Sequence, residues 1–67
     1  MKAEVLIKAT SPYGEGEYQK GDVGIVDGYC RGGDNVPCAV VIVRERFILI
    51  PVYSLEFLHW IYEKDNN

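Results

Sequence analysis

The apolar residues of this chain fall into short runs, and clusters of Gly, Pro or charged residues separate one run from the next about every ten residues. No segment keeps an apolar period of about 3.6 residues long enough for a helix of three turns. Short runs at this spacing are typical of small all-β domains. The sequence therefore predicts an all-β fold, with strands expected at residues 3–9, 22–30, 38–43, 47–50 and 59–62.

The segments between these runs predict the connections. The longest is 10–20, TSPYGEGEYQK, where Pro12, Gly14 and Gly16 interrupt regular structure. Residues 31–37 should form a hairpin loop that turns at Gly32-Gly33, and 44–46 a charged turn. Pro51 should end the fourth strand, because proline has no N–H to donate to a strand ladder. Residues 52–58 are expected to form a short turn with one 3-10 turn in it.

Two strands carry further information. Gly24 and Gly28 lie inside the second expected strand, which predicts a bulge or a place where another backbone passes close by. The third strand, CAVVIV, is apolar throughout, which predicts burial on both of its faces.

Short motifs also resemble a known group of proteins. KGDVGIV (Lys20–Val26) resembles the Gly-x-x-Gly-x-Val core of KOW-type and other bacterial SH3-like barrels. The order GDVGIV, CAVVIV, FILIPVYSLEFL is similar to the small barrels of photosystem I subunit IV and the ferredoxin–thioredoxin reductase variable subunit, and to prophage-encoded SH3-like proteins. The resemblance implies an SH3-like five-stranded barrel with a short 3-10 turn before the last strand. It also implies an accessory protein, with a phage or prophage origin.

Size and composition limit what such a domain can do. The 67 residues predict a single domain, 1–67, with a frayed tail at 64–67. So short a chain has little room for a deep substrate pocket and is expected to act through its surface. The longest uncharged apolar run is far shorter than a membrane helix, and the N-terminus has no signal-peptide core, so a cytoplasmic protein without membrane contact is expected.

The charges argue against a nucleic-acid partner. The formal net charge is −3, whereas nucleic-acid binders usually carry a basic patch. The basic residues are dispersed among acids: Lys2, Lys8, Lys20, Arg31, Arg44, Arg46 and Lys64. A KOW-like nucleic-acid-binding barrel remains the alternative, because the chain has aromatic residues on which bases can stack.

Catalytic, metal and phosphate sites lack the residues they need. His59 is the only histidine, and nothing in the sequence brings Cys30 or Cys38 beside it as a nucleophile. A zinc site needs four ligands, and no second cysteine pair is present. The RGGDNVP loop has no helix after it to bind phosphate. The prediction is a non-enzymatic protein without a cofactor.

The two cysteines flank the expected hairpin loop and should lie opposite each other. At a pair without hydrogen bonds, their Cα atoms would be close enough for a disulfide. In the cytoplasm, however, such thiols stay reduced and pack as small apolar groups. Reduced cysteines are therefore expected.

Aromatic and loop residues define the expected binding surface for a larger protein partner. IPVYSLEFL (Ile50–Leu58) resembles the Ile-Pro-Ser-Asn-Tyr-Val stretch of peptide-binding SH3 domains, but Tyr53 comes one residue early and the Ala-Leu-Tyr-Asp-Tyr motif is absent. Strict recognition of proline-rich peptides is therefore not expected. The alternative reading makes Pro51 a strand end, Tyr53 half-buried, and Tyr13 and Tyr18 anchors of the long loop.

The candidate residues come from three segments of a protein expected to be a monomer or a homodimer. They are Tyr13, Glu15, Glu17 and Tyr18 of the first loop, Arg31, Asp34 and Asn35 of the hairpin tip, and Pro51 and Tyr53. Such a protein would be an accessory, regulatory or inhibitor module.

Overall fold

The computed structural model describes residues 1–14 and 16–62, so the predictions for Glu15 and for the tail 64–67 lie outside the described residues. Within them, the chain forms five antiparallel strands in one sheet and two 3-10 turns. The elements are β1 (Lys2–Ile7), β2 (Val23–Arg31), η1 (Gly33–Asn35), β3 (Pro37–Val43), β4 (Arg46–Pro51), η2 (Val52–Ser54) and β5 (Leu55–Ile61). The predicted all-β class is confirmed. Nowhere in this part of the chain is there a helix able to span a membrane.

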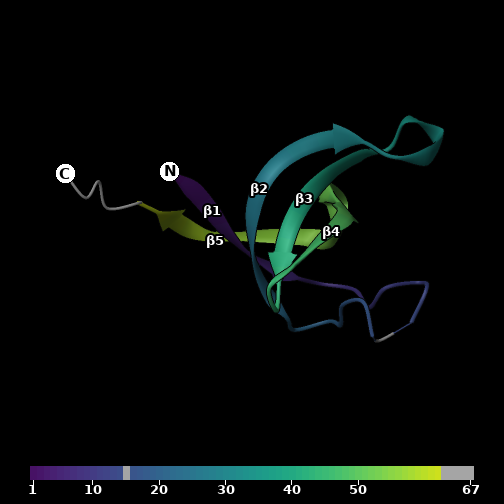
Figure 1. The fold of residues 1–67 in the computed structure, drawn as a ribbon, viewed down its shortest axis with the longest axis horizontal. Helices are drawn as coiled ribbons and strands as arrows, with labels where there is room; N and C mark the ends of the chain where they lie inside the picture. Colours follow the sequence, from purple (N-terminus) through teal and green to yellow (C-terminus); the bar gives the residue numbers. More distant parts are fainter. Residues whose placement is uncertain (15, 63–67) are drawn as a thin grey trace.

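The strands follow the order β4-β3-β2-β1-β5 in the sheet. Strands β2, β3 and β4 form two successive hairpins, and β5 returns to pair with β1 on the side away from β2. In the described chain, β4 and β5 are the two edges of the sheet. Figure 1 shows β1 and β5 together at one end, and the β2–β3 hairpin curving toward the other.

The expected strands are found, with one main correction. β5 begins at Leu55, four residues earlier than the expected start at His59, and the 3-10 turn occupies Val52–Ser54 alone. Its first residues are in strand because they pair with β1: Leu55 lies opposite Ile7, and Phe57 opposite Val5. The expectation of a turn over 52–58 is therefore wrong for residues 55–58, which belong to a strand with a bulge.

The two glycines of β2 have different roles, and both expectations for them are met. Gly24 is buried at a close approach: a Cβ there would lie against Val41 and 2.9 Å from the carbonyl oxygen of Ile42. Between Val26 and Gly28 the register with β3 shifts, which marks a bulge at Asp27. Nothing lies within 4 Å of a Cβ built at Gly28, so that glycine does not serve close packing.

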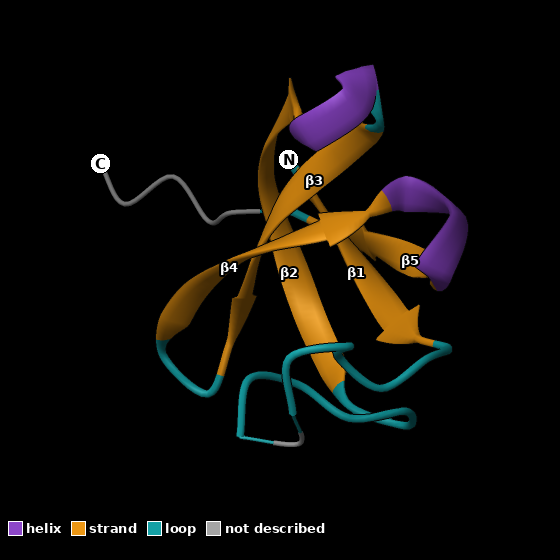
Figure 2. Ribbon diagram, turned by 90° about the vertical axis from the view of Figure 1, so that its right-hand side faces the viewer, coloured by secondary structure: helices purple, strands orange, loops and turns teal. Residues whose placement is uncertain are grey.

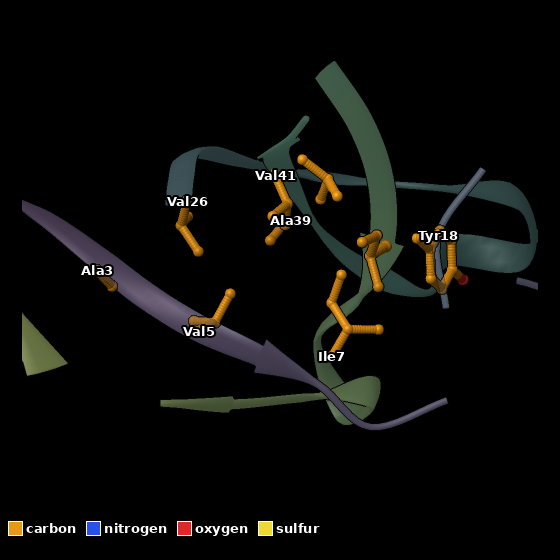
Figure 3. Packing of buried hydrophobic residues seen from close by; sticks show 9 residues of the cluster. Ala3, Val5, Ile7, Tyr18, Val26, Ala39 and Val41 are labelled. Atoms are coloured by element: carbon orange, nitrogen blue, oxygen red, sulfur yellow. The ribbon is translucent and has the colours of Figure 1, made fainter. Parts of the chain in front are cut away.

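Alternation along β1 and β3 produces the core (Figure 3). Ala3, Val5 and Ile7 are buried on one face of β1, while Lys2, Glu4 and Leu6 on the other face are half-buried. The remaining core residues come from β2, β3, β4 and the long loop: Tyr18, Val26, Ala39, Val41, Val43 and Ile50. A core made of alternate residues leaves one face of the sheet outside it.

The prediction that β3 is buried on both faces holds on its outer face at Cys38 but is wrong at Val40 and Ile42. Ala39, Val41 and Val43 are buried, whereas Val40 and Ile42 between them are half-buried. The chain is too short to supply a second layer over that face. An apolar strand pattern therefore continues onto a surface that is partly open to solvent.

Figure 2 views the sheet from the end at which the loops gather. The loop between β1 and β2 lies below, the tip of the β2–β3 hairpin lies above, and β4 runs into η2 between them. This arrangement brings together three segments that are far apart in the sequence.

Candidate functional site

The loop between β1 and β2 is held by its own backbone. Ser11 N–H donates to the Tyr18 carbonyl at 3.1 Å, and Gly21 N–H donates to the Ile7 carbonyl at 2.8 Å. Ser11 is buried, accepts the Tyr13 N–H at 3.0 Å and donates to a Glu17 carboxylate oxygen at 3.2 Å. These hydrogen bonds fix the backbone conformation of the loop, and Tyr13 remains 87% exposed.

Two arginines of the β3–β4 turn fasten this loop from outside. Arg44 Nη1 lies 2.8 Å from Asp22 Oδ2, and Arg46 Nη2 donates to the Gly16 carbonyl at 2.5 Å. Both guanidinium groups also reach the Glu17 carbonyl, at 3.5 and 3.3 Å. The Gln19 N–H, with the Arg44 guanidinium, holds the pKa of Asp22 below its ordinary 3.8. We call Arg44 and Arg46 the arginine clamp.

The hairpin tip turns at residues other than the expected ones. Asp34 and Asn35 have positive φ angles of 57° and 61°, so they, and not Gly32-Gly33, occupy the left-handed positions. Asp and Asn tolerate this conformation better than other non-glycine residues. Gly32 instead permits close packing, since a Cβ there would lie 2.9 Å from Cys38 Sγ.

Between the loop, the hairpin tip and β4 lies a groove of about 630 Å³. We call it the loop groove. Its lining comes from all three segments and from the residues around η2: Pro12, Tyr13, Glu17, Tyr18, Gly32, Gly33, Asp34, Val36, Cys38, Arg46, Phe47, Ile48, Leu49, Pro51 and Tyr53. The expectation of little room for a deep pocket has to be qualified, because a small domain can still form a groove of this size between its loops.

The sides of the groove are aromatic and apolar. Tyr53 is 71% exposed and Phe47 is 66% exposed, and Leu49 on the same face of β4 as Phe47 is also exposed. Large apolar side chains gathered at a concave surface are typical of binding sites. The predicted half-burial of Tyr53 is wrong, and Tyr18 alone of the two loop tyrosines anchors the loop in the core.

Among the described residues, the charged side chains that line the groove are two acids and one base. Arg46 is engaged by loop carbonyl oxygens, while Glu17 and Asp34 stand on opposite walls. Burial, and next the Glu17 carboxylate, raise the pKa of the Tyr18 hydroxyl above its ordinary 10.0. The Tyr18 hydroxyl thus remains neutral at physiological pH, and the groove presents carboxylates and not a basic face.

The structure brings most of the predicted candidate residues together. Six of the nine line the loop groove: Tyr13, Glu17, Tyr18, Asp34, Pro51 and Tyr53. Asn35 lies at the hairpin tip, where its carbonyl accepts a bond from Arg31 Nη1 at 3.1 Å. Arg31 lines a second, smaller hollow with Tyr29, Cys30 and Pro37. Glu15 lies outside the described residues.

Sequence reasoning missed the contribution of β4. Phe47 and Leu49 are exposed and line the groove. Ile50 is buried in the core, and Ile48 packs against the core while also lining the groove. The signal was present in FILI, an apolar pattern on both faces of a strand at the sheet edge.

Cys30 and Cys38 are opposite each other, as predicted, and both are free. The pair type differs from the one that favours a disulfide. Gly32 N–H donates to the Val36 carbonyl at 2.8 Å, so Gly32–Val36 is a hydrogen-bonded pair. Such pairs alternate with non-hydrogen-bonded pairs along the ladder, and Cys30–Cys38, two positions further on, is therefore also a hydrogen-bonded pair. At such a pair the Cβ atoms are about 5.5 Å apart, beyond the usual disulfide range.

Further pairs join ionisable groups of β1, β2 and β5. His59 Nε2 lies 2.5 Å from Glu4 Oε1 on the outer face of the sheet, and Lys2 Nζ lies 2.9 Å from Asp27 Oδ1. Across residues 1–14 and 16–62, no three His, Cys, Asp or Glu side chains gather in a way that would hold a metal ion.

Comparison of the chain with protein-family models, with curated proteins and with solved structures found no match.

Proposed function

We propose that this chain is a non-catalytic protein-binding module of the SH3-like barrel type, and that its loop groove receives an extended segment of a larger protein. The single observation that carries the proposal is the gathering of Tyr13, Tyr53, Phe47 and Leu49, all exposed, around one groove. Exposed aromatic residues at a concave surface are the usual centre of binding energy in protein interfaces. The module would serve as an accessory, regulatory or inhibitor protein.

The barrel assignment is supported by the topology. A sheet in the order β4-β3-β2-β1-β5, a long loop after β1 and a 3-10 turn directly before β5 are features expected of an SH3-like barrel. The resemblance of KGDVGIV and FILIPVYSLEFL to such barrels points the same way. A phage or accessory-subunit origin follows from that resemblance alone.

The charges favour a protein over a nucleic acid. Glu17 and Asp34 would repel phosphates, and the guanidinium of Arg46 is already bound by carbonyl oxygens. A segment with apolar and basic side chains would complement the groove better than a phosphate backbone.

The test is selection of peptides from a random displayed library on the immobilised protein, followed by titration of the selected peptides into ¹⁵N-labelled protein. We expect amide shifts at Tyr13, Phe47 and Tyr53, and a loss of affinity of at least about tenfold in Tyr53→Ala. The matched control is Tyr29→Ala, since Tyr29 is also 70% exposed but does not line the groove.

Two results would contradict the proposal. Peptides whose shifts map outside the loop groove, or whose affinity is the same in Tyr53→Ala, would remove the groove as the binding site. Tight, salt-dependent binding of short DNA or RNA would replace the proposal with the nucleic-acid alternative.

A further inference from the structure

Strand β5 is an edge strand whose far side is open in the described structure. It pairs with β1 on one side, and no other described strand pairs with it. Every residue from Glu56 to Trp60 is exposed. Phe57 and Trp60 have ring centroids 5.0 Å apart and remain 52% and 50% exposed. An exposed edge with apolar side chains is a template for pairing with another strand.

The register with β1 decides which side chains share a face. Phe57 and Trp60 lie opposite Val5 and Ala3, so they are on the core side of the sheet. The register shifts between Glu4 and Val5, which leaves Leu58 as the bulged residue of β5. Because of that bulge, Glu56 and His59 both lie on the outer face.

These positions make β5 complementary to itself. If two copies of β5 run antiparallel about a two-fold axis between Phe57 and Leu58, Glu56 opposes His59 of the second copy, and symmetry repeats the pair. Leu55 then opposes Trp60 on the core side. An axis on Leu58 would oppose Glu56 to Trp60, which lie on different faces. An axis between Leu58 and His59 would oppose Glu56 to Ile61 and leave the carboxylate opposite an aliphatic side chain.

We propose that a second copy of this chain docks along the free edge of β5, antiparallel, with Glu56 opposite His59 across a two-fold axis. The two sheets become one continuous sheet, and Phe57 and Trp60 of both copies form one aromatic surface on its core side. The ring of His59 is already oriented on the outer face by Glu4, at 2.5 Å. Complementary polar side chains directly across antiparallel strands stabilise the pairing, and like charges destabilise it. This dimer does not depend on the function proposed for the loop groove.

The test is sedimentation equilibrium of the full chain from about 10 µM to about 1 mM, with dimer mass expected at the upper end. Glu56→Lys should weaken the dimer by at least about tenfold, because it replaces the carboxylate opposite each His59 ring by an ammonium group, twice in the symmetric pair. The matched control is Glu45→Lys, in the β3–β4 turn, which changes the net charge from −3 by the same two units and should leave the dimer unchanged. His59→Lys places an ammonium group opposite Glu56 and should retain the dimer.

An isotope-filtered NMR experiment on a mixed labelled sample tests the register. We expect intermolecular contacts between backbone protons of Glu56 and His59. A monomer at about 1 mM, or equal weakening by Glu56→Lys and Glu45→Lys, would overturn the proposal. Contacts between Glu56 and Ile61 would overturn the register, and contacts at the loop groove would overturn the docking surface. A one-dimensional spectrum of each variant establishes that it is folded.

Discussion

Arg44 and Glu45 both adopt a left-handed backbone, with φ angles of 48° and 67°. This is the geometry of a type I′ hairpin turn, which matches the twist of the flanking strands and favours Asn or Gly at these positions. Side chains longer than Asn or Gly make such a conformation costly. Arg44 has a compensating role in the arginine clamp, whereas no interaction of the Glu45 side chain is observed in the described structure.

We therefore expect Glu45→Gly to stabilise the fold. Glycine relieves the left-handed strain but also increases the conformational entropy of the unfolded chain. The net effect should be to raise the free energy of unfolding by about 0.5–1 kcal/mol. Urea denaturation followed by Trp60 fluorescence measures this change. Glu45→Ala is the control, because alanine keeps the strain and loses the same carboxylate. Equal stability of the two variants would show that the turn is not strained at this residue.

At the scale of elements, β2 lies between β1 and β3 in the sheet, and it packs closely against β3 at Gly24. Gly24 lies opposite Val5, and a side chain there would press on Val41 and on the Ile42 carbonyl. Gly28 sits past the bulge, where a methyl group would meet nothing within 4 Å. Gly24 thus permits close packing of β2 against β3, whereas Gly28 has room for a side chain.

Gly24→Ala should destabilise the protein by about 1–3 kcal/mol, because the backbone neighbour cannot move aside easily. Gly28→Ala, in the same strand and with the same chemical change, should alter the free energy of unfolding by less than about 0.5 kcal/mol. Thermal unfolding of both variants measures the difference. If Gly28→Ala were the more damaging change, the assignment of close packing to Gly24 would be wrong.

At the scale of the whole molecule, the buried Tyr18 hydroxyl couples folding to alkaline pH. Its pKa is raised above 10.0 in the folded protein, by burial and then by Glu17, while the unfolded chain ionises it near that ordinary value. The contribution of Tyr18 to stability is therefore complete below pH 10 and is lost as the pH rises toward the folded pKa.

Tyr18→Phe removes this dependence. At neutral pH the variant should be less stable by about 1 kcal/mol, since it loses the interaction of the Tyr18 hydroxyl with Ser11. Between about pH 9 and pH 11 the wild type should lose stability more steeply than the variant, and the two curves should converge. Urea titrations across this range test it, with the other titrating residues common to both proteins. Parallel curves would contradict the prediction.

Much of this fold can be predicted from the sequence, because the patterns that indicate its strands and turns are local. Alternation in β1, the breaks at Gly and Pro, and the opposite placement of Cys30 and Cys38 all follow from neighbouring residues. Six groove residues could also be predicted, because aromatic residues, acids and a proline in loops are recognisable by residue type as candidates for a binding surface.

What the sequence did not reveal depends on tertiary pairing. The early start of β5 at Leu55 is decided by its partner Ile7 in β1, and the groove-facing side of Phe47 and Leu49 by the register with β3. The left-handed backbone lies at Asp34 and Asn35 although two glycines precede them, and Gly32 packs closely against Cys38. Such choices are made between strands, so no single run of residues contains them.

The arginine clamp grips the long loop mainly by main-chain oxygen atoms, at Gly16 and Glu17, and those oxygens are present whatever residues occupy these positions. The backbone path of the loop therefore depends only partly on which side chains the loop carries. Residues such as Tyr13 can be exchanged while the loop keeps its course. Randomised loop libraries on this scaffold would change ligand preference without rebuilding the groove.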